Sequence, residues 1–182
     1  MVFDLLKQGF TTPGYDGQNF FDTDHPVLDA NDQEVSVSNM QAGAGEPWFL
    51  LDTSRPIKPL VFQERIPYTP QSLMRDTDEH VLMRDEYLFG IRARMNAGFA
   101  LWQLAFGSRD TLTPANYADA RARMQSMRYD GGRIMGVMPT LVVVSPNNES
   151  TARQILKSAR INGSDNEWAE SAELLVSPYL AS

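Results

Sequence analysis

The stretch YDGQNFFDTDHP, Tyr15 to Pro26, places several groups that could do chemistry close together in the chain. Asp16, Asp22, Asp24 and His25 supply three carboxylates and an imidazole within ten residues. Two carboxylates held across a cleft can divide the roles of acid and base in glycosidase-like hydrolysis. Carboxylates with an imidazole can also bind a metal ion, but a third ligand must come from elsewhere. The other histidine of the chain is His80.

A structural interpretation of the same stretch is favoured over these chemical ones. Aspartates in a glycine-rich loop commonly accept hydrogen bonds from their own backbone, and they form Asx-turns. Phe20 and Phe21 are then expected to hold the loop against a core. A small metal-dependent hydrolase that uses Asp22, Asp24 and His25 is kept as an alternative.

Two further motifs carry weaker functional signals. Ser145 follows an apolar run and precedes a proline, but the glycines of a nucleophile elbow are missing, so a helix cap is predicted. Arg92 and Arg94 would share one face of a strand. That row could contact phosphate or an acidic neighbouring subunit, and a solvated sheet face is favoured.

Composition excludes several classes of protein. The 182 residues carry 23 acidic and 16 basic side chains, a net charge of −7, so general attraction to nucleic acid is not expected. The absence of cysteine excludes disulfides and thiolate metal sites. No stretch approaches the roughly 18 apolar residues of a membrane span, and no signal peptide is evident.

Local patterns predict an α+β fold. Residues 2–10 are typical of the last turns of a helix, with Gly9 as its C-terminal cap, and residues 11–47 are expected to be irregular. Residues 59–66 have the composition of a strand. Residues 88–106 are predicted to form a long hairpin that turns at Asn96-Ala97-Gly98, with Ile91, Ala93 and Met95 on the apolar face of its first strand.

The last third of the chain alternates helix and strand. A helix should begin at Thr113-Pro114 and bury Tyr117, Ala120, Met124 and Met127. Residues 141–144 form a buried strand, a second helix follows Ser145-Pro146, and AELLVSPYL is a closing strand.

Five blocks, in order along essentially the whole chain, carry a family resemblance. They are FDLLKQGFTTPGYDGQNFFDTDHPV, WFLLDTSRPIKPLVFQER, EYLFGIRARMNAGFALWQLAFGS, PTLVVVSP and AELLVSPYL. Together they resemble the major head subunit of Mu-like phages and prophages, the gpT family. The resemblance implies the tailed-phage major capsid fold, mainly its axial domain with part of the peripheral domain. The N-terminal arm, the extended loop and most of the spine helix would be missing.

The resemblance also implies how the chain is organised and what it does. Residues 1–182 would be a single C-terminal capsid domain: 1–10 end the spine helix, 11–47 are loop-rich, 48–111 hold strands and a long hairpin, and 112–182 alternate helix and strand. The implied function is structural, as a subunit of an icosahedral head around packaged double-stranded DNA. A head accessory or decoration module is a second alternative. No catalysis, cofactor or metal is implied.

Partners and location follow from the same resemblance. The implied partners are copies of the chain and full-length capsid subunits, with scaffolding and portal proteins as further candidates. Packaged DNA would be contacted only indirectly, and no membrane is involved. The chain would reside in the virion capsid, and in the bacterial host cytoplasm before assembly. Candidate subunit-contact residues are Trp48, Trp102, Trp168, Arg92 and Arg94.

Overall fold

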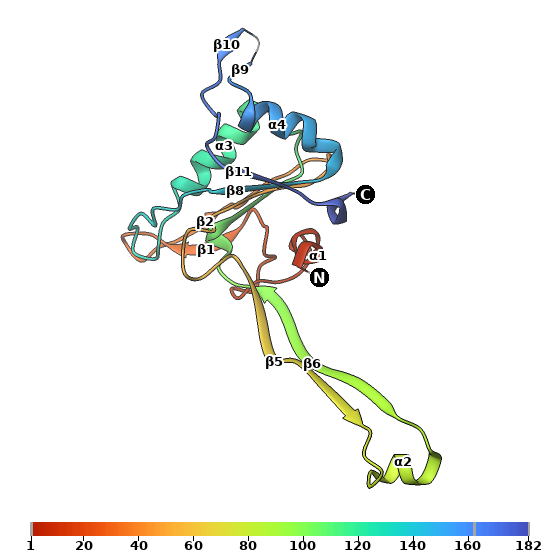
Figure 1. The fold of residues 1–182 in the computed structure, drawn as a ribbon. Helices are drawn as coiled ribbons and strands as arrows, with labels where there is room; N and C mark the ends of the chain where they lie inside the picture. The colour runs from red at the N-terminus through yellow and green to blue at the C-terminus, as the bar shows by residue number, and fades with distance from the viewer. Residues whose placement is uncertain (1, 162, 182) are drawn as a thin grey trace. The chain divides into compact units, whose positions relative to one another are not determined.

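The computed structural model describes residues 2–161 and 163–181, and the chain divides into two compact units (Figure 1). Unit 1 combines the residues up to Val61 with those from Gly98 onward. Unit 2 is the intervening segment Phe62–Ala97. Local sequence patterns did not indicate that residues 62–97 form a separate compact unit.

A five-stranded mixed sheet forms the centre of unit 1, in the order β11-β8-β4-β7-β3. Strand β4 is antiparallel to both of its neighbours, while β11 is parallel to β8 and β3 is parallel to β7. Its strands are β3 (Met40–Gln41), β4 (Trp48–Leu51), β7 (Ala105–Ser108), β8 (Leu141–Val144) and β11 (Glu173–Val176). Strands β4 and β7 are buried at every position, as expected for short apolar runs in the middle of a sheet.

Helices cover this sheet on both sides, with α3 and α4 on one side and α1 on the other (Figure 1). They are α1 (Val2–Gln8), α3 (Pro114–Gln125) and α4 (Glu149–Lys157). The predicted start of α3 is confirmed, because Thr113 Oγ1 accepts a hydrogen bond from the N–H of Asn116 and Pro114 occupies the first turn. The four predicted apolar side chains, Tyr117 to Met127, are buried.

Smaller elements complete unit 1. The two-stranded sheets are β1 (His25–Leu28) with β2 (Glu34–Val37), and β9 (Arg160–Ile161) with β10 (Ser164–Asp165). Single 3₁₀ turns are η1 (Trp102–Leu104), η2 (Pro146–Asn148) and η3 (Pro178–Leu180). The expectation that residues 11–47 are irregular is therefore wrong for β1, β2 and β3. The strands at 25–28 and 34–37 are too short to show a sustained alternation of apolar and polar residues.

Phenylalanine rings join α1 and the following loop to the sheet. Phe21 is buried against the rings of Phe10, Phe20 and Phe49, with centroids 4.9–5.3 Å away. Gly9 does not adopt the left-handed conformation of the predicted cap. A Cβ at Gly9 would lie 2.7 Å from the Phe21 ring, so glycine is needed there for close packing.

Unit 2 consists mainly of two paired strands with a short helix between them. These are β5 (Leu60–Leu73), α2 (Glu79–Arg84) and β6 (Leu88–Phe99), and the ends of both strands extend into unit 1. The predicted turn at residues 96–98 is wrong, because β6 continues through it and pairs with β5 rather than with β7. Strand β5 contains Pro67 and Pro70, which a two-stranded sheet tolerates because each strand has an unpaired edge.

Candidate functional site

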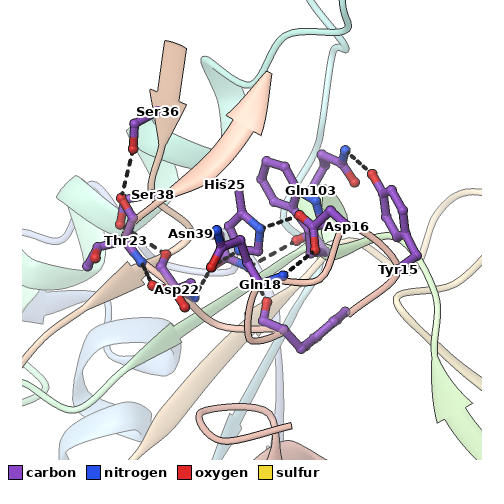
Figure 2. A network of polar contacts seen from close by, with 12 residues as sticks. Tyr15, Asp16, Gln18, Asp22, Thr23, His25, Ser36, Ser38, Asn39 and Gln103 are labelled. Atoms are coloured by element: carbon purple, nitrogen blue, oxygen red, sulfur yellow. Dashed lines mark hydrogen bonds and ion pairs between the residues drawn. The ribbon is translucent and has the colours of Figure 1, made fainter. Parts of the chain in front are cut away.

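The structure brings the carboxylate of Asp16, and not that of Asp22, to His25 (Figure 2). Asp16 Oδ2 lies 2.6 Å from Nδ1 of His25, whose side chain is fully buried. Asp22 turns its carboxylate to the N–H of Thr23 at 2.7 Å, which is the local Asx-type bonding expected of this loop. Asp24 is exposed. The carboxylates therefore do not form the facing pair that hydrolysis requires.

His25 belongs to a buried polar network that the sequence did not reveal in full. Its Nε2 lies 3.1 Å from Oδ1 of Asn39, and its ring stacks on Trp102 with centroids 3.9 Å apart. Asn39 Nδ2 donates to the carbonyls of Phe20, Trp102 and Ala105. The network therefore ties the loop before β1 to the segment before β7, and this role is structural.

No metal site is found in the part of the chain that the structure describes. Among residues 2–161 and 163–181, no group of three or more histidine, aspartate or glutamate side chains is placed to hold an ion. His80, the potential third ligand, belongs to unit 2 and pairs with Glu86 at 3.6 Å. The geometry gives the metal-dependent hydrolase no support. Within the same residues, no helix has the length and apolar character needed to cross a bilayer.

Ser145 does not cap a helix as predicted. It precedes the 3₁₀ turn η2, where its side chain makes no capping bond, and its hydroxyl instead donates to the carboxylate of Glu46. Asn147 Nδ2 donates to the same carboxylate at 2.5 Å. Glu46 thus fastens the start of α4 to the loop before β4, a contact between distant segments that no local pattern indicates.

Large exposed apolar side chains are concentrated in unit 2, which holds ten of the twenty found among the described residues although it is much the smaller unit. Of its described side chains, only Val81 is buried. Ile91, which lies on the apolar face predicted for its strand, is 73% exposed. The large apolar side chains that are exposed on unit 2, here called the hairpin surface, are Phe62, Tyr68, Leu73, Met74, Leu82, Met83, Tyr87, Leu88, Phe89 and Ile91. Such a concentration is typical of a surface that another protein covers.

The candidate subunit-contact residues separate into core and surface. Trp48 and Trp102 are 0% and 1% exposed inside unit 1, so their side chains cannot reach another subunit in this conformation. Trp168 is half-buried and meets Tyr117 edge-on at 5.6 Å. Arg92 and Arg94 are exposed on β6 beside the hairpin surface. The distinction between core and surface depends on burial. The sequence around an isolated tryptophan does not show whether its side chain is buried.

Asp52 is a second buried polar centre, and it holds the segment before β8. Its Oδ1 accepts from the N–H and hydroxyl of Ser54, and its Oδ2 accepts from the N–H of Met138 at 3.0 Å. Burial by itself raises the pKa of Asp52. The bonds from Ser54, Met138 and Arg55 outweigh burial and hold the pKa below the ordinary value of 3.8.

We expect Asp52→Asn to lower the free energy of unfolding by about 1–3 kcal/mol at neutral pH. Both carboxylate oxygens of Asp52 accept hydrogen bonds, and the NH₂ group of asparagine would face one of these sets of donors instead of accepting from it. The native carboxylate stabilises the fold above pH 3.8, and that contribution is lost as the pH falls through the lowered folded-state pKa. Wild type and variant should therefore converge in acid. Urea unfolding over a pH series measures this, with the exposed Asp76→Asn as control. A constant difference down to the lowest pH would contradict it.

Comparison with known proteins decides the family. The family model described as Mu-like prophage major head subunit gpT matches residues 1–180. The chain belongs to this family. Members of the gpT family are structural subunits of phage heads rather than enzymes. The metal-dependent hydrolase is therefore set aside.

Individual members of the family agree in sequence and in fold. The major capsid protein of Escherichia phage Mu is 40% identical over 190 residues, which cover 99% of this chain and 62% of that protein. The procapsid of bacteriophage JBD30 matches with a TM-score of 0.83 and 42% identity, covering 98% of this chain and 62% of that one. The JBD30 capsid decorated with minor capsid protein trimers matches with a TM-score of 0.77 and 26% identity, covering 99% of this chain and 61% of that one. The α+β chain thus spans about 62% of the length of these relatives.

Proposed function

We propose that this chain is a structural subunit of a Mu-like phage or prophage head and forms part of the icosahedral shell around packaged double-stranded DNA. Its place would be the virion capsid, after synthesis in the host cytoplasm. The proposal rests on membership of the gpT family and on the likeness to capsid and procapsid structures. Mainly the axial domain with part of the peripheral domain would be represented.

The hairpin surface is the observation in the structure that supports assembly. Among the described residues of unit 2 the one buried side chain is Val81 of α2, so the two-stranded sheet cannot be stabilised by a core of its own. Ten large apolar side chains would remain in water unless a neighbouring molecule covered them. In a closed shell the same surface recurs on every copy, so a contact made once is repeated by symmetry.

Polar residues beside the hairpin surface fit the same role. Arg92 and Arg94 lie on β6, and arginine is enriched in protein interfaces because it combines charge with a flat apolar face. Trp168 remains a candidate through its exposed part. The proposed partners are copies of the chain and full-length capsid subunits, with scaffolding and portal proteins beyond them. A net charge of −7 fits a wall that contacts packaged DNA only indirectly.

Co-assembly tests the proposal. The mass of the purified chain is measured by light scattering, alone and after mixing with a full-length gpT-family subunit during head assembly. We expect a small species alone and incorporation of the chain into the shell of the full-length subunit. Binding only to preformed heads would instead identify an accessory module. Exclusion from both would contradict a capsid role.

A further inference from the structure

The imidazole of His25 lies between two hydrogen-bond acceptors. Asp16 Oδ2 is 2.6 Å from Nδ1, and Asn39 Oδ1 is 3.1 Å from Nε2 (Figure 2). The His25 side chain is fully buried, and that of Asp16 is 10% exposed. Water can therefore do little to satisfy either ring nitrogen, and the protein groups decide which of them carries hydrogen.

The identity of the Asn39 atom that faces the ring follows from its other partners. Nδ2 lies 2.8 Å from the carbonyl of Phe20 and 3.3 Å from those of Trp102 and Ala105. Oδ1 accepts the N–H of Asp22 at 2.9 Å. If the amide were turned round, its oxygen would face three carbonyl oxygens and its NH₂ group would face an N–H. The orientation with Oδ1 toward His25 is therefore fixed, and Nε2 must donate.

The other ring nitrogen faces a carboxylate, so that contact also requires a hydrogen. A neutral imidazole has one N–H and one lone pair. With an ionised Asp16, a neutral ring would leave the lone pair of a buried nitrogen directed at an oxygen. That contact is repulsive, and a buried acceptor without a donor costs free energy.

We propose that Asp16 and His25 together hold two protons in the folded protein, as a buried imidazolium–carboxylate pair. One proton is on Nε2, and the second lies between Nδ1 and Asp16. This second proton fastens the loop before β1. The loop is tied down through Asp16, while the ring is fixed by Asn39 and by stacking on Trp102. Loss of the extra proton on raising the pH would break one of the two bonds and loosen residues 13–24. This inference is independent of a role in capsids.

The surrounding charges are consistent with such a pair. Asp16 borders a cavity of about 280 Å³ that is also lined by Tyr15, Arg128, Tyr129 and Asp130. The Arg128 guanidinium donates to the carbonyl of Gly132, and Asp130 accepts the N–H of Leu28. The Asp22 carboxylate is turned to Thr23. Among the bonds of the described residues, Asp16 is thus the carboxylate that meets the ring.

The sign of the pH dependence follows directly. The protonated pair exists in the folded protein, so its stabilisation is present at lower pH and is lost as the pH rises through deprotonation of the pair. Asp16→Asn should remove this dependence. An asparagine can donate its NH₂ group to Nδ1 while a neutral ring donates from Nε2, which satisfies both contacts without an extra proton.

The test combines unfolding with nitrogen NMR. Urea midpoints are measured from mildly acidic to mildly alkaline pH for wild type, Asp16→Asn and the control Asp24→Asn, which changes an exposed carboxylate of the same loop. We expect the midpoint of wild type and control to fall toward alkaline pH, and that of Asp16→Asn to stay flat. Parallel profiles for all three would overturn the proposal.

The ring spectrum of wild type decides the matter without any variant. In spectra of ¹⁵N-labelled histidine, both ring nitrogens of His25 should carry hydrogen at neutral pH if the second proton resides on Nδ1. A carboxyl proton on Asp16 that bonds to Nδ1 would appear as a hydrogen-bonded O–H resonance with Nε2 protonated, and it also retains two protons. A ring with one hydrogen and no such resonance would overturn the proposal, even if Asp16→Asn failed to fold.

Discussion

Replacing Phe89 and Ile91 together by aspartate should abolish entry of the chain into a capsid shell and leave its own fold intact. Both side chains belong to the hairpin surface, at 74% and 73% exposure, so the isolated chain buries little of either. We expect its free energy of unfolding to change by no more than about 0.5 kcal/mol per substitution, as for other surface positions. In a contact that covers this surface, two buried carboxylates without partners would each cost several kcal/mol.

Co-assembly with a full-length family member and urea unfolding of the free chain measure the two effects separately. The matched control is Phe89→Leu with Ile91→Val, which keeps the surface apolar and should still enter the shell. Normal incorporation of the aspartate variant would exclude Phe89 and Ile91 from the subunit contact. A large loss of stability in the free chain would instead show that unit 2 folds on these side chains, contrary to their exposure.

The elements that could be predicted from the sequence are those whose local signals agree with their tertiary setting. The start of α3 depends on Thr113 and Pro114, which act within one helical turn. Strand β8 is a short apolar run bounded by Thr140 and Ser145, and it is buried in the sheet as such runs usually are. In both cases nothing distant opposes the local preference.

The pairing of β5 with β6 could not be predicted because it runs against local signals. Asn96, Ala97 and Gly98 are common turn residues, yet they lie within a strand. Proline is disfavoured in strand interiors, yet β5 contains Pro67 and Pro70. This is tolerated because β5 pairs with β6 along one edge only, so many of its N–H groups have no partner strand to bond to. The alternation of Ile91, Ala93 and Met95 correctly indicated a strand. It did not indicate a core face, because an apolar face that another molecule covers has the same pattern.

The candidate site was predicted in its residues but not in its connections. Asp16 and His25 were both singled out, yet Asp22 and Asp24 are nearer to His25 in sequence and looked equally able to meet it. Asp16, nine residues before His25, is the carboxylate that does so, and the distance along the chain does not indicate this. Asn39, which fixes the far side of the ring, comes from beyond the β1–β2 hairpin. No spacing rule connects it to His25.

Trp102→Ala should destabilise the chain itself by about 3–5 kcal/mol, the usual loss for removing a buried large aromatic side chain. Trp102 is almost completely buried and stacks on His25 at 3.9 Å, so its removal opens a cavity beside a polar network that depends on exclusion of water. This loss is a large part of the 5–15 kcal/mol that stabilises a typical domain. Urea unfolding of the isolated chain measures it without any assembly.

Trp168→Ala is the informative comparison, because both residues were candidate contacts and only Trp168 keeps an exposed part. Its half-burial against Tyr117 predicts a smaller loss of stability than that of Trp102→Ala. A subunit contact through Trp168 would appear as reduced incorporation into shells by a variant that is still folded. If Trp102→Ala cost less than about 1 kcal/mol in the free chain, the ring would not be part of the core, and the network around His25 would need another support.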